Sequence, residues 1–383
     1  MSQESSQLWP HEQPLVAVAR ALLADPMARV DPCHAERVPY DYGSPTTAGL
    51  FRLRGGAHKE DVDGPESVFL KLVRSFRHWP VVAHLPPDQQ ELARSSPLWR
   101  YEIDVYAGGL GDALPPGMRL PRVHAISDLG DDFVALFLED VQVDEAPWDA
   151  ATFARAAELL GRMAARLTRA DALPSMASRV AGEVTRLHYT SRLLPSALPA
   201  LRSEVTWSHP LLATDSAQVL RHDLLELAEL VPDLLDELVR RPQILMHGDA
   251  SPQNLLVPVD EPGSFVVIDW TIGGLAAVGD DLGQLLIGLA HAGPLRVAQL
   301  EALRDVVVTS YTAGLTAEGL AVTAGDVRYG MDAGLVVRSA FTALPVERLG
   351  EPVTDELALL IDSRLALTRY LVDLGLALPR VAA

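Results

Sequence analysis

Residues 244–257 read ILMHGDASPQNLLV, a run in which polar residues stand between two apolar segments. The backbone amides of the apolar segments need hydrogen-bond partners, which favours two short buried strands. The residues between them, from His247 to Asn254, then form a turn at an open edge, where side chains can face a cleft. We therefore expect Asp249 and Asn254 on a turn that buried strands hold in place.

Asp249 and Asn254 supply two kinds of oxygen atom. A carboxylate can accept the proton of a hydroxyl group, and an amide oxygen can bind a hard cation. Asp269 follows fifteen residues after Asn254, at the end of the β-branched run FVVIDW. Asp and Asn oxygens together suit Mg²⁺, which commonly binds one or two protein ligands as well as phosphate oxygens. The three residues therefore indicate a metal site and, through it, a nucleotide.

Lysine is rare in this chain. Lys and Arg total 32 residues, yet the only lysines are Lys59 and Lys71. Lys59 lies in the polar stretch GGAHKEDVDG, which is typical of a loop, whereas Lys71 interrupts the apolar strand-like run SVFLKLV. Two interpretations of Lys71 are open. It has a functional role, or it lies on an edge strand and its ammonium group reaches solvent.

The first third of the chain has the pattern of a small sheet. Residues 36–56 read as strand, loop and strand, SVFLKLV as a third strand, and RVHAIS and FVALFLED as two more. A helix is expected over residues 96–110, with Glu102 on it, and residues 14–24 also have helical spacing. Five strands and a helix therefore account for residues 36–140.

The rest of the chain is mainly helical, apart from the strands around Asp249 and Asp269. Helices are expected over residues 148–170, about 176–194 and 215–241, and again toward the carboxyl end. We therefore expect an α+β protein of two lobes. Residues 1–140 would form a lobe with a mostly antiparallel sheet, and residues 141–383 a helical lobe with a ligand cleft at the junction.

Composition excludes several classes of protein. Hydrophobic residues make up 48% of the 383 residues and charged residues 22%, which argues against extensive disorder. Cys33 is the only cysteine, so no internal disulfide forms, and the first residues lack the pattern of a secretory signal. No apolar run approaches the ~18 residues that cross a bilayer. These features predict a cytoplasmic protein outside the membrane.

The net charge of −19 disfavours nucleic acid and anionic lipid surfaces as partners. This charge suits a cationic small molecule better, although acidity also serves solubility alone. The acidic run DLLELAELVPDLLDEL presents the same choice, because its carboxylates either bind a polycation or form the solvated face of an amphipathic helix. The apolar spacing of the run favours the solvated face.

Taken together, the motifs resemble those of a known family of kinases. HGDxxxxN, then IDW, then GDDLGQLL occur in the order found in small-molecule kinases of the aminoglycoside phosphotransferase and choline kinase type. The resemblance covers residues ~40 to 290. It implies a bilobal protein-kinase-like fold and Mg²⁺-dependent transfer of phosphate from ATP, or another nucleoside triphosphate, to a hydroxyl group of a small molecule.

The resemblance also implies roles for single residues. Asp249 corresponds to the catalytic Asp that orients or deprotonates the acceptor hydroxyl, and Asn254 and Asp269 correspond to the two Mg²⁺ ligands. Lys71 corresponds to the lysine that touches the α- and β-phosphates, and Glu102 to its ion-pair partner. An arginine would not replace this compact ammonium without rearrangement.

Two further segments are assigned by their order along the chain. The loop GSPTTAG at residues 43–49 occupies the position of the phosphate-covering turn, where Ser44, Thr46 and Thr47 can donate to phosphate oxygens. The turn from Glu139 to Val141 resembles the hinge whose backbone meets adenine.

Neighbouring polar residues have structural interpretations. His247 is expected to pack against the catalytic loop and to hydrogen-bond backbone, and Asp281 to begin a helix and hold the loop. Asp280 and His291 are expected to be surface or helix residues. Trp270 and Thr271 stand where protein kinases have Phe-Gly, which favours a small-molecule kinase.

The acceptor and the assembly state remain open. Helices over about 176–241 and 295–378 would form the acceptor pocket, and aminoglycoside-like antibiotics, amino alcohols, sugars and other hydroxylated metabolites are all candidate acceptors. The protein could be a monomer or a homodimer. One alternative is a pseudokinase that binds nucleotide without catalysis. Another is a metal hydrolase that uses the side chains of His247, Asp249, Asp269 and His291.

Overall fold

The structure is a computed structural model that describes residues 35–39, 44–54, 67–85, 87–169 and 180–379. The helix expected at residues 14–24, the loop around Lys59 and the loop residue Gly43 lie outside these ranges. Two compact units make up the chain, one of residues 1–109 with 120–142 and one of residues 110–119 with 143–383. Within the described ranges, no helix is both long and apolar enough to cross a membrane.

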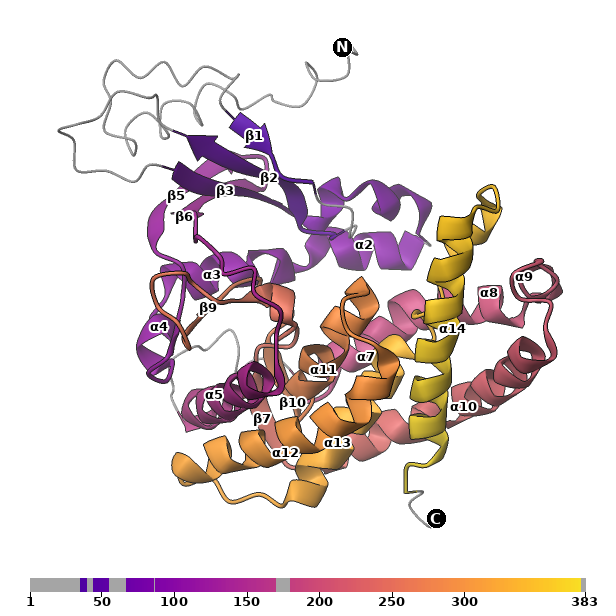
Figure 1. The fold of residues 1–383 in the computed structure, drawn as a ribbon. Coiled ribbons are helices and arrows are strands. Elements are labelled where there is room, and N and C mark those ends of the chain that lie inside the picture. The colour runs from indigo at the N-terminus through magenta and orange to yellow at the C-terminus, as the bar shows by residue number, and fades with distance from the viewer. Residues whose placement is uncertain (1–34, 40–43, 55–66, 86, 170–179, 380–383) are drawn as a thin grey trace. The chain divides into compact units, whose positions relative to one another are not determined.

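The first unit is built on a five-stranded antiparallel sheet (Figure 1). In spatial order the strands are β1 (Ala35–Arg37), β2 (Thr47–Arg54), β3 (Ser67–Arg74), β6 (Phe133–Glu139) and β5 (Val123–Gly130). Every neighbouring pair is antiparallel. The strands expected from SVFLKLV, RVHAIS and FVALFLED are confirmed.

β3 is the central strand of this sheet, and it carries Lys71. Lys71 stands opposite Leu50 of β2 and Leu136 of β6. Alternate residues of β3 bury their side chains in an apolar cluster with Phe51 and Phe137, while Lys71 projects from the opposite face. With only 7% of its surface exposed, Lys71 is not an edge-strand lysine that reaches solvent.

Short helices follow the central strand. The helix expected over residues 96–110 is shorter and divided, because Ser96 caps a 3₁₀ turn with Pro97 at its first position, and the α-helix after it ends before Gly108. Glu102 lies in the first turn of that helix and is buried. The helical elements of this unit are η3 (Phe76–His78), η4 (Pro80–His84), α2 (Pro87–Ser95), η5 (Pro97–Arg100) and α3 (Tyr101–Ala107).

In the second unit, two small sheets hold the ILMHGDASPQNLLV stretch. β7 (Gln243–Met246) pairs antiparallel with β10 (Gly274–Ala277), and its last three residues are buried. β8 (Leu255–Leu256) pairs antiparallel with β9 (Phe265–Val267), and β4 (Met118–Arg119) is parallel to β9. The two short buried strands expected on either side of Asp249 are therefore confirmed.

Helices form the rest of the second unit. Those expected over residues 148–170 and 215–241 are confirmed as α5 and α10, whereas the helix expected near 176–194 becomes a short α-helix followed by a π-helical turn that contains Pro195. The elements are α4 (Leu110–Ala113), α5 (Ala150–Arg169), α7 (Glu183–His188), η6 (Tyr189–Ala197), α8 (Leu198–Arg202), α9 (Glu204–Trp207), α10 (Asp215–Arg240), η7 (Pro252–Asn254), α11 (Asp281–Ala292), η8 (Val297–Gln299), α12 (Leu300–Ala317), α13 (Ala324–Ser339), η9 (Val346–Gly350) and α14 (Asp355–Leu376).

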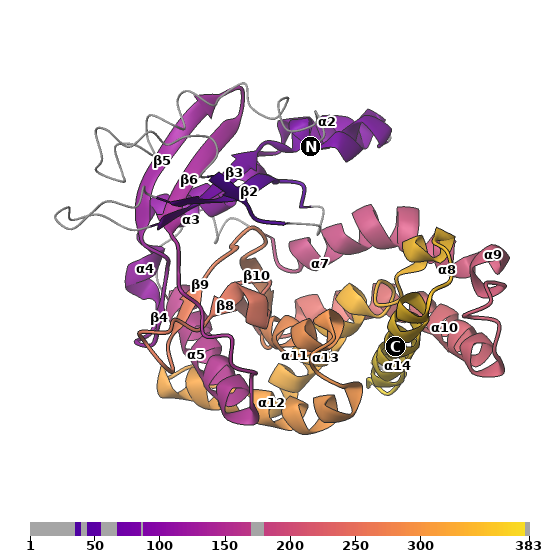
Figure 2. The ribbon, with the colours of Figure 1, turned by 45° about the horizontal axis from the view of Figure 1, so that its top comes forward.

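Helices α5 and α12 lie side by side and approach closely (Figure 2). A Cβ atom on Gly161 of α5 would lie 2.3 Å from the carbonyl oxygen of Tyr311, and one on Gly314 of α12 would lie 2.0 Å from that of Glu158. Only glycine fits at these two positions. α5 also packs against β7, the strand that leads into His247, so this helix pair supports the position of the turn.

Candidate active site

The turn after β7 needs glycine at position 248. Gly248 has a φ of +89°, and a Cβ atom there would lie 2.3 Å from the carbonyl oxygen of Ile272. The N–H groups of His247 and Gly248 donate to the two carboxylate oxygens of Asp281, at 3.1 and 2.7 Å. Asp281 is buried at the start of α11, so it holds the loop as the sequence predicts.

His247 is fully buried, and both of its ring nitrogens are engaged. Nδ1 accepts from the N–H of Asp249 at 3.1 Å, which places the proton on Nε2, 2.8 Å from the carbonyl oxygen of Ile268. The ring also packs against Trp270, with ring centres 4.5 Å apart. The expected packing role of His247 is confirmed, and neither nitrogen is left to bind a metal.

Asp249 follows this histidine, and its carboxylate is 32% exposed. The Nδ2 of Asn254 donates to the carbonyl oxygen of Asp249 at 2.9 Å and to its Oδ2 at 3.2 Å. Desolvation raises the pKa of Asp249, and the negative charge of Asp269 raises it further. The structure thus brings together the three residues expected to perform catalysis and bind metal.

Asp269 comes two residues after β9 in an unusual backbone conformation. Its φ of +59° lies in the left-handed region, which costs a residue with a side chain roughly 1 kcal/mol. The Oγ1 of Thr271 donates to its Oδ1, and the N–H of Ile268 donates to the carbonyl oxygen of Asn254 at 3.0 Å. Backbone strain of this kind is concentrated at functional sites in proteins.

Arg338, near the end of α13, is a site residue that sequence reasoning missed. Its Nη1 donates to the carbonyl oxygen of Gly248, and its Nη2 lies 3.7 Å from Oδ1 of Asp249. Its positive charge lowers the pKa of Asp249 and so opposes the effect of desolvation. One signal was available, because Arg338 interrupts an apolar run, LVVRSAF, as Lys71 interrupts SVFLKLV.

Asp280 was expected to be a surface or helix residue. It stands at the start of a helix, but it does not lie at the surface. Asp280 precedes α11 and is only 3% exposed. A Cβ atom on Gly334 of α13 would lie 2.6 Å from its Oδ1, so a glycine makes room for the carboxyl group. Burial raises the pKa of Asp280 to about 7, and the neighbouring charge of Asp281 adds to the rise. His291 is exposed near the end of α11, as expected.

In the first unit, Lys71 and Glu102 form the ion pair that the resemblance implies. Nζ of Lys71 lies 2.9 Å from Oε1 of Glu102 and 2.7 Å from Oε2. The two side chains are 9% and 2% exposed. The pair therefore fixes the ammonium group at the middle of β3.

The remaining predicted residues also lie in the first unit. Thr46 and Thr47 are buried where β2 begins, and Ser44 Oγ accepts from the N–H of Thr47 at 3.3 Å. Glu139 ends β6, and its N–H donates to the carbonyl oxygen of Arg122 at 2.8 Å. Val141 follows it after one residue. The roles of these residues stay predictions.

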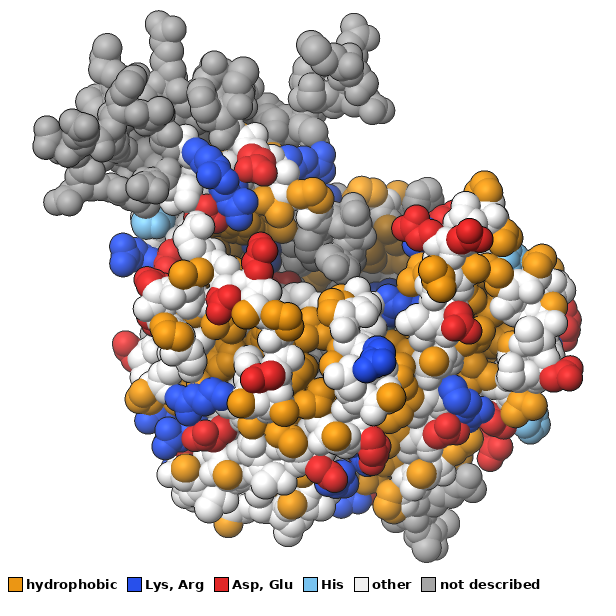
Figure 3. Space-filling model, viewed as in Figure 1, with side chains coloured by type: hydrophobic (Ala, Val, Ile, Leu, Met, Phe, Trp, Pro, Cys, Tyr) orange, Lys and Arg blue, Asp and Glu red, His pale blue; other side chains and the backbone are white. Residues whose placement is uncertain are grey.

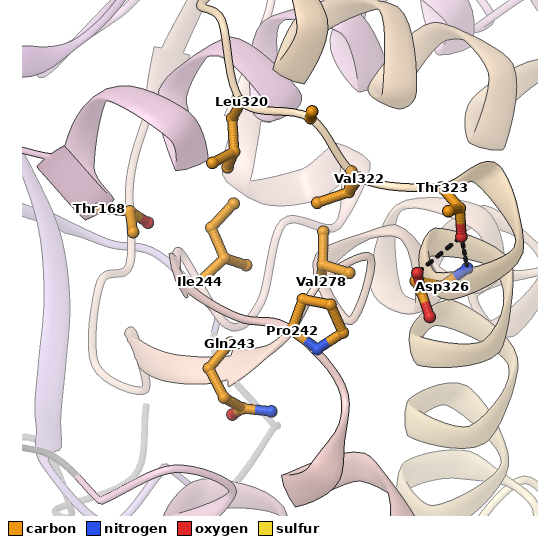
Figure 4. Close-up of a pocket in the computed structure, with 10 residues that line it drawn as sticks. Thr168, Pro242, Gln243, Ile244, Val278, Leu320, Val322, Thr323 and Asp326 are labelled. Carbon is orange, nitrogen blue, oxygen red and sulfur yellow. Dashed lines mark hydrogen bonds between the residues drawn. The ribbon is translucent and has the colours of Figure 1, made fainter.

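A cavity of about 450 Å³ is lined in part by residues of β7 (Figure 4). Ile244, Val278, Leu320 and Val322 point into it, and none of the predicted site residues lines it. Two of the lining residues are hydrogen-bonded to each other, since the Oγ1 of Thr323 donates to Oδ2 of Asp326 at 2.6 Å. The walls are mostly apolar, so this cavity does not hold the polar groups that the chemistry requires.

The comparison with known proteins gives a family and a fold. The profile of the phosphotransferase enzyme family matches residues 68–317, well over half of the chain. No curated protein matches the chain significantly. Two solved structures share the fold over nearly their whole length. Their sequence identity to this chain is low, so the similarity establishes the fold alone.

One is a choline kinase from Cryptosporidium parvum, with a TM-score of 0.53, 12% identity, and coverage of 96% of this chain and 98% of that one. The other is the amicoumacin kinase hAmiN in complex with AMP-PNP, Ca²⁺ and Ami, with a TM-score of 0.51, 14% identity, and coverage of 97% and 96%. The chain therefore belongs to the phosphotransferase enzyme family and has a protein-kinase-like α+β fold.

Proposed function

We propose that this chain transfers the γ-phosphoryl group of Mg·ATP to a hydroxyl group of a small molecule. The observation that carries the proposal is the arrangement around Asp249. Asn254 and Asp269 come from separate segments of the chain. Asn254 donates a hydrogen bond to the carboxylate of Asp249, and the charge of Asp269 raises the pKa of that carboxylate. The buried pair of Lys71 and Glu102 supports the same reaction class.

In the proposed reaction, Asp249 receives the proton of the acceptor hydroxyl. The hydroxyl oxygen attacks the γ-phosphorus atom, the bond from that atom to the β–γ bridging oxygen breaks, and ADP leaves. Desolvation raises the pKa of Asp249, which makes the carboxylate a stronger base. Asn254 holds both the backbone and the Oδ2 of this residue, so the carboxylate is positioned before the acceptor arrives.

The donor set of the second unit fits a hard divalent cation. The Nδ2 of Asn254 is engaged by Asp249, which leaves its Oδ1 as the acceptor atom of the amide. Asp249 and Asp269 act on each other as like charges, and a cation would relieve this repulsion. Asn254 and Asp269 would hold Mg²⁺, which when bound neutralises charge on the phosphate oxygens.

We assign the nucleotide contacts of the first unit by the same reasoning. Lys71 would interact with the α- and β-phosphates, and Glu102 would hold its ammonium group in place. Ser44, Thr46 and Thr47 belong to the turn proposed to cover the phosphates, and since the two threonine side chains are buried, backbone N–H groups are the better donors there. The backbone from Glu139 to Val141 would meet adenine. An ATP-dependent reaction also favours the cytoplasm as its location.

A screen for ADP release tests this proposal. Wild-type protein is incubated with Mg·ATP and a panel of amino alcohols, sugars, aminoglycosides and hydroxy acids, with ADP measured against a control without acceptor. We expect ADP release that requires both Mg²⁺ and one class of acceptor. Nucleotide binding without acceptor-dependent release across the panel would support the pseudokinase alternative instead. Hydrolysis of a substrate without any nucleotide would support the metal hydrolase.

A further inference from the structure

Several basic side chains of the second unit lie near one another, beginning with Arg338. Arg338 contacts the loop at Gly248 and Asp249, and its charge also lowers the pKa of His188 at the end of α7. Helices α7 and α13 pack against each other, consistent with this proximity. A line of basic groups therefore begins beside the carboxylate that would receive the acceptor proton.

Arg192, in the π-helical turn η6, extends this line. Its positive charge lowers the pKa of His188 and also that of His291 near the end of α11. Desolvation is the larger cause in both cases; the pKa of the partly buried His188 falls to about 3, whereas His291 is exposed and its pKa is lowered less. Both rings are therefore neutral at pH 7, and Arg192 lies close to both.

Arg364 of α14 completes the group. Its Nη2 donates to the carbonyl oxygen of His291, and its charge lowers the pKa of that ring. Five elements of the second unit thus contribute one side chain each to a contiguous set. We call this set the basic cluster, and it consists of His188, Arg192, His291, Arg338 and Arg364.

Several polar groups of the basic cluster have no hydrogen-bond partner among the residues that the structure describes. Nη1 of Arg364 and Nε2 of His188 are buried without a hydrogen bond. Arg192 makes no ion pair with any residue that the structure describes and is exposed. Buried polar atoms in native proteins almost always have a partner, so such orphaned groups indicate a missing ligand or water.

Acidic side chains near the basic cluster balance it only in part. Glu347 acts on Arg364 as an opposite charge, and Arg338 has Asp249 beside it. Asp280 keeps part of its proton near pH 7, and the proposed cation would neutralise Asp249 and Asp269. Once nucleotide and metal are bound, Arg192 and Arg364 remain as positive charges without full compensation.

The acidic run on α10 does not provide a competing site for a polycation. Four of its six carboxylates pair with arginines of this chain, and on the face of the second unit that Figure 3 shows, acidic and basic side chains are interspersed. The interpretation as a solvated helix face is confirmed for Glu229 and Asp236, whose side chains are 76% and 54% exposed, whereas Glu237 is buried. The pairs are Asp223–Arg369 at 2.7 Å, Glu229–Arg202 at 3.1 Å, Asp236–Arg186 at 2.6 Å and Glu237–Arg241 at 2.7 Å.

We propose that the acceptor carries an anionic group, a carboxylate or a phosphate, which Arg192 and Arg364 bind while the acceptor hydroxyl lies at Asp249. This inference rests on the proposed function and names its substrate class. It opposes the expectation from the net charge of −19, because binding depends on the charges at the site and the distant ones are screened. Guanidinium groups suit both kinds of anion, since they donate paired N–H groups to two oxygens.

Matched acceptors that differ in one group test the inference. Glucose, glucosamine, glucuronic acid and glucose 6-phosphate present similar hydroxyl groups with neutral, cationic, carboxylate and phosphate substituents. Binding to the protein with Mg·AMP-PNP is measured by calorimetry, and turnover with Mg·ATP by ADP release. We expect one of the two anionic sugars to bind at least about tenfold more tightly than glucose and glucosamine, which corresponds to about 1.4 kcal/mol.

Variants identify the residues responsible. Arg192→Gln and Arg364→Gln should each remove the advantage of the anionic sugar over glucose, and Arg192→Lys should keep part of it. Arg240→Gln is the matched control, because Arg240 is an exposed arginine at the end of α10 that pairs with Glu237. Arg192 is exposed, so its variants should fold. Tighter or equal binding of the neutral or cationic sugar would overturn the inference, as would an unchanged preference in Arg192→Gln.

The two readouts separate this inference from the proposed function. Preferential binding of an anionic sugar that Arg192→Gln removes would support the anion site even if no sugar is phosphorylated. Turnover of glucosamine or glucose in preference to both anionic sugars would support a kinase and contradict the anion site.

Discussion

The two units of the chain hold their charged site residues in opposite ways. In the first unit, the ammonium group of Lys71 lies 2.7 Å from a carboxylate oxygen of Glu102, and both side chains are buried. In the second unit, the carboxylates of Asp249 and Asp269 act on each other as like charges. The nearest guanidinium nitrogen given for Asp249, Nη2 of Arg338, lies 3.7 Å from its Oδ1. The first set is a pair of opposite charges, whereas the second places two like charges near each other.

This difference indicates which part of each unit is preformed. A buried ion pair with mutual hydrogen bonds keeps its geometry without a ligand, so the ammonium group of Lys71 would already be in place for the phosphate contact proposed above. The like charges of Asp249 and Asp269 in the second unit would instead be relieved by the proposed cation, which Asn254 and Asp269 would hold. The following predictions test this contrast, beginning with the largest expected effect.

Replacement of Asp249 by Asn should abolish most phosphoryl transfer. The amide cannot accept the hydroxyl proton, and loss of a general base typically costs 10²–10⁴-fold in rate, so we expect a fall of roughly 10³-fold in kcat. Mg·ATP should still bind, because the proposed nucleotide contacts are elsewhere. Steady-state ADP release and calorimetry measure the two quantities, and Asp260→Asn, at an exposed position, is the control. Full transfer by Asp249→Asn would refute the proposed mechanism.

The burial of Asp280 should make the stability of the second unit depend on pH. Its pKa is raised from 3.8 to about 7, so the folded protein keeps a proton that the unfolded chain releases. This contribution is complete below pH 3.8 and is lost as the pH rises through 7. At about 1.4 kcal/mol per pKa unit, the loss is up to about 4 kcal/mol.

Urea unfolding at several pH values measures this effect. Asp280→Asn removes the titration, so the variant should gain free energy of unfolding relative to wild type between pH 5 and pH 8. The same comparison with Asp260→Asn should be flat. A difference between Asp280→Asn and wild type that does not change with pH would contradict the assignment.

Removal of one partner should expose the cost of the buried pair in the first unit. Lys71→Ala removes the ammonium group that faces the buried carboxylate of Glu102, and we expect a loss of about 3 kcal/mol in stability together with weaker binding of Mg·ATP. A double variant, Lys71→Met with Glu102→Leu, should recover most of the stability but not the nucleotide affinity. Recovery of both would mean that the pair has a structural role alone.

The smallest predicted effect concerns the carboxylate that holds the loop. Asp281→Asn keeps one of the two oxygen acceptors that serve the N–H groups of His247 and Gly248. We expect a loss of about 2 kcal/mol in stability and faster hydrogen exchange of these two amides. Unchanged exchange at both amides would show that the loop does not depend on Asp281.

Local patterns in the sequence were sufficient for the main elements of the fold. The alternation in SVFLKLV predicted a strand, and the structure shows why Lys71 can interrupt it, since the residue projects from the face opposite the apolar cluster. The apolar segments on either side of Asp249 predicted β7 and β8, because buried segments need partners for their backbone amides. Periodicity reports which face of an element is buried, and that information is local.

Contacts between distant elements could not be predicted in this way. Arg338 reaches Gly248 from α13, and the burial of Asp280 depends on Gly334 in the same helix. Helix α13 packs against both α11 and β10, and no pattern within a single segment encodes this packing. The basic cluster was missed for the same reason, because its five side chains come from five elements.

The central claim is that the chain forms a phosphate ester on a small-molecule hydroxyl. The most direct measurement is ³¹P NMR of wild-type protein with Mg·ATP and an acceptor from the screen. We predict a new phosphate monoester resonance that grows as ADP appears and that is absent with Asp249→Asn. The claim would be contradicted if no monoester formed with any acceptor while the same sample still bound Mg·ATP.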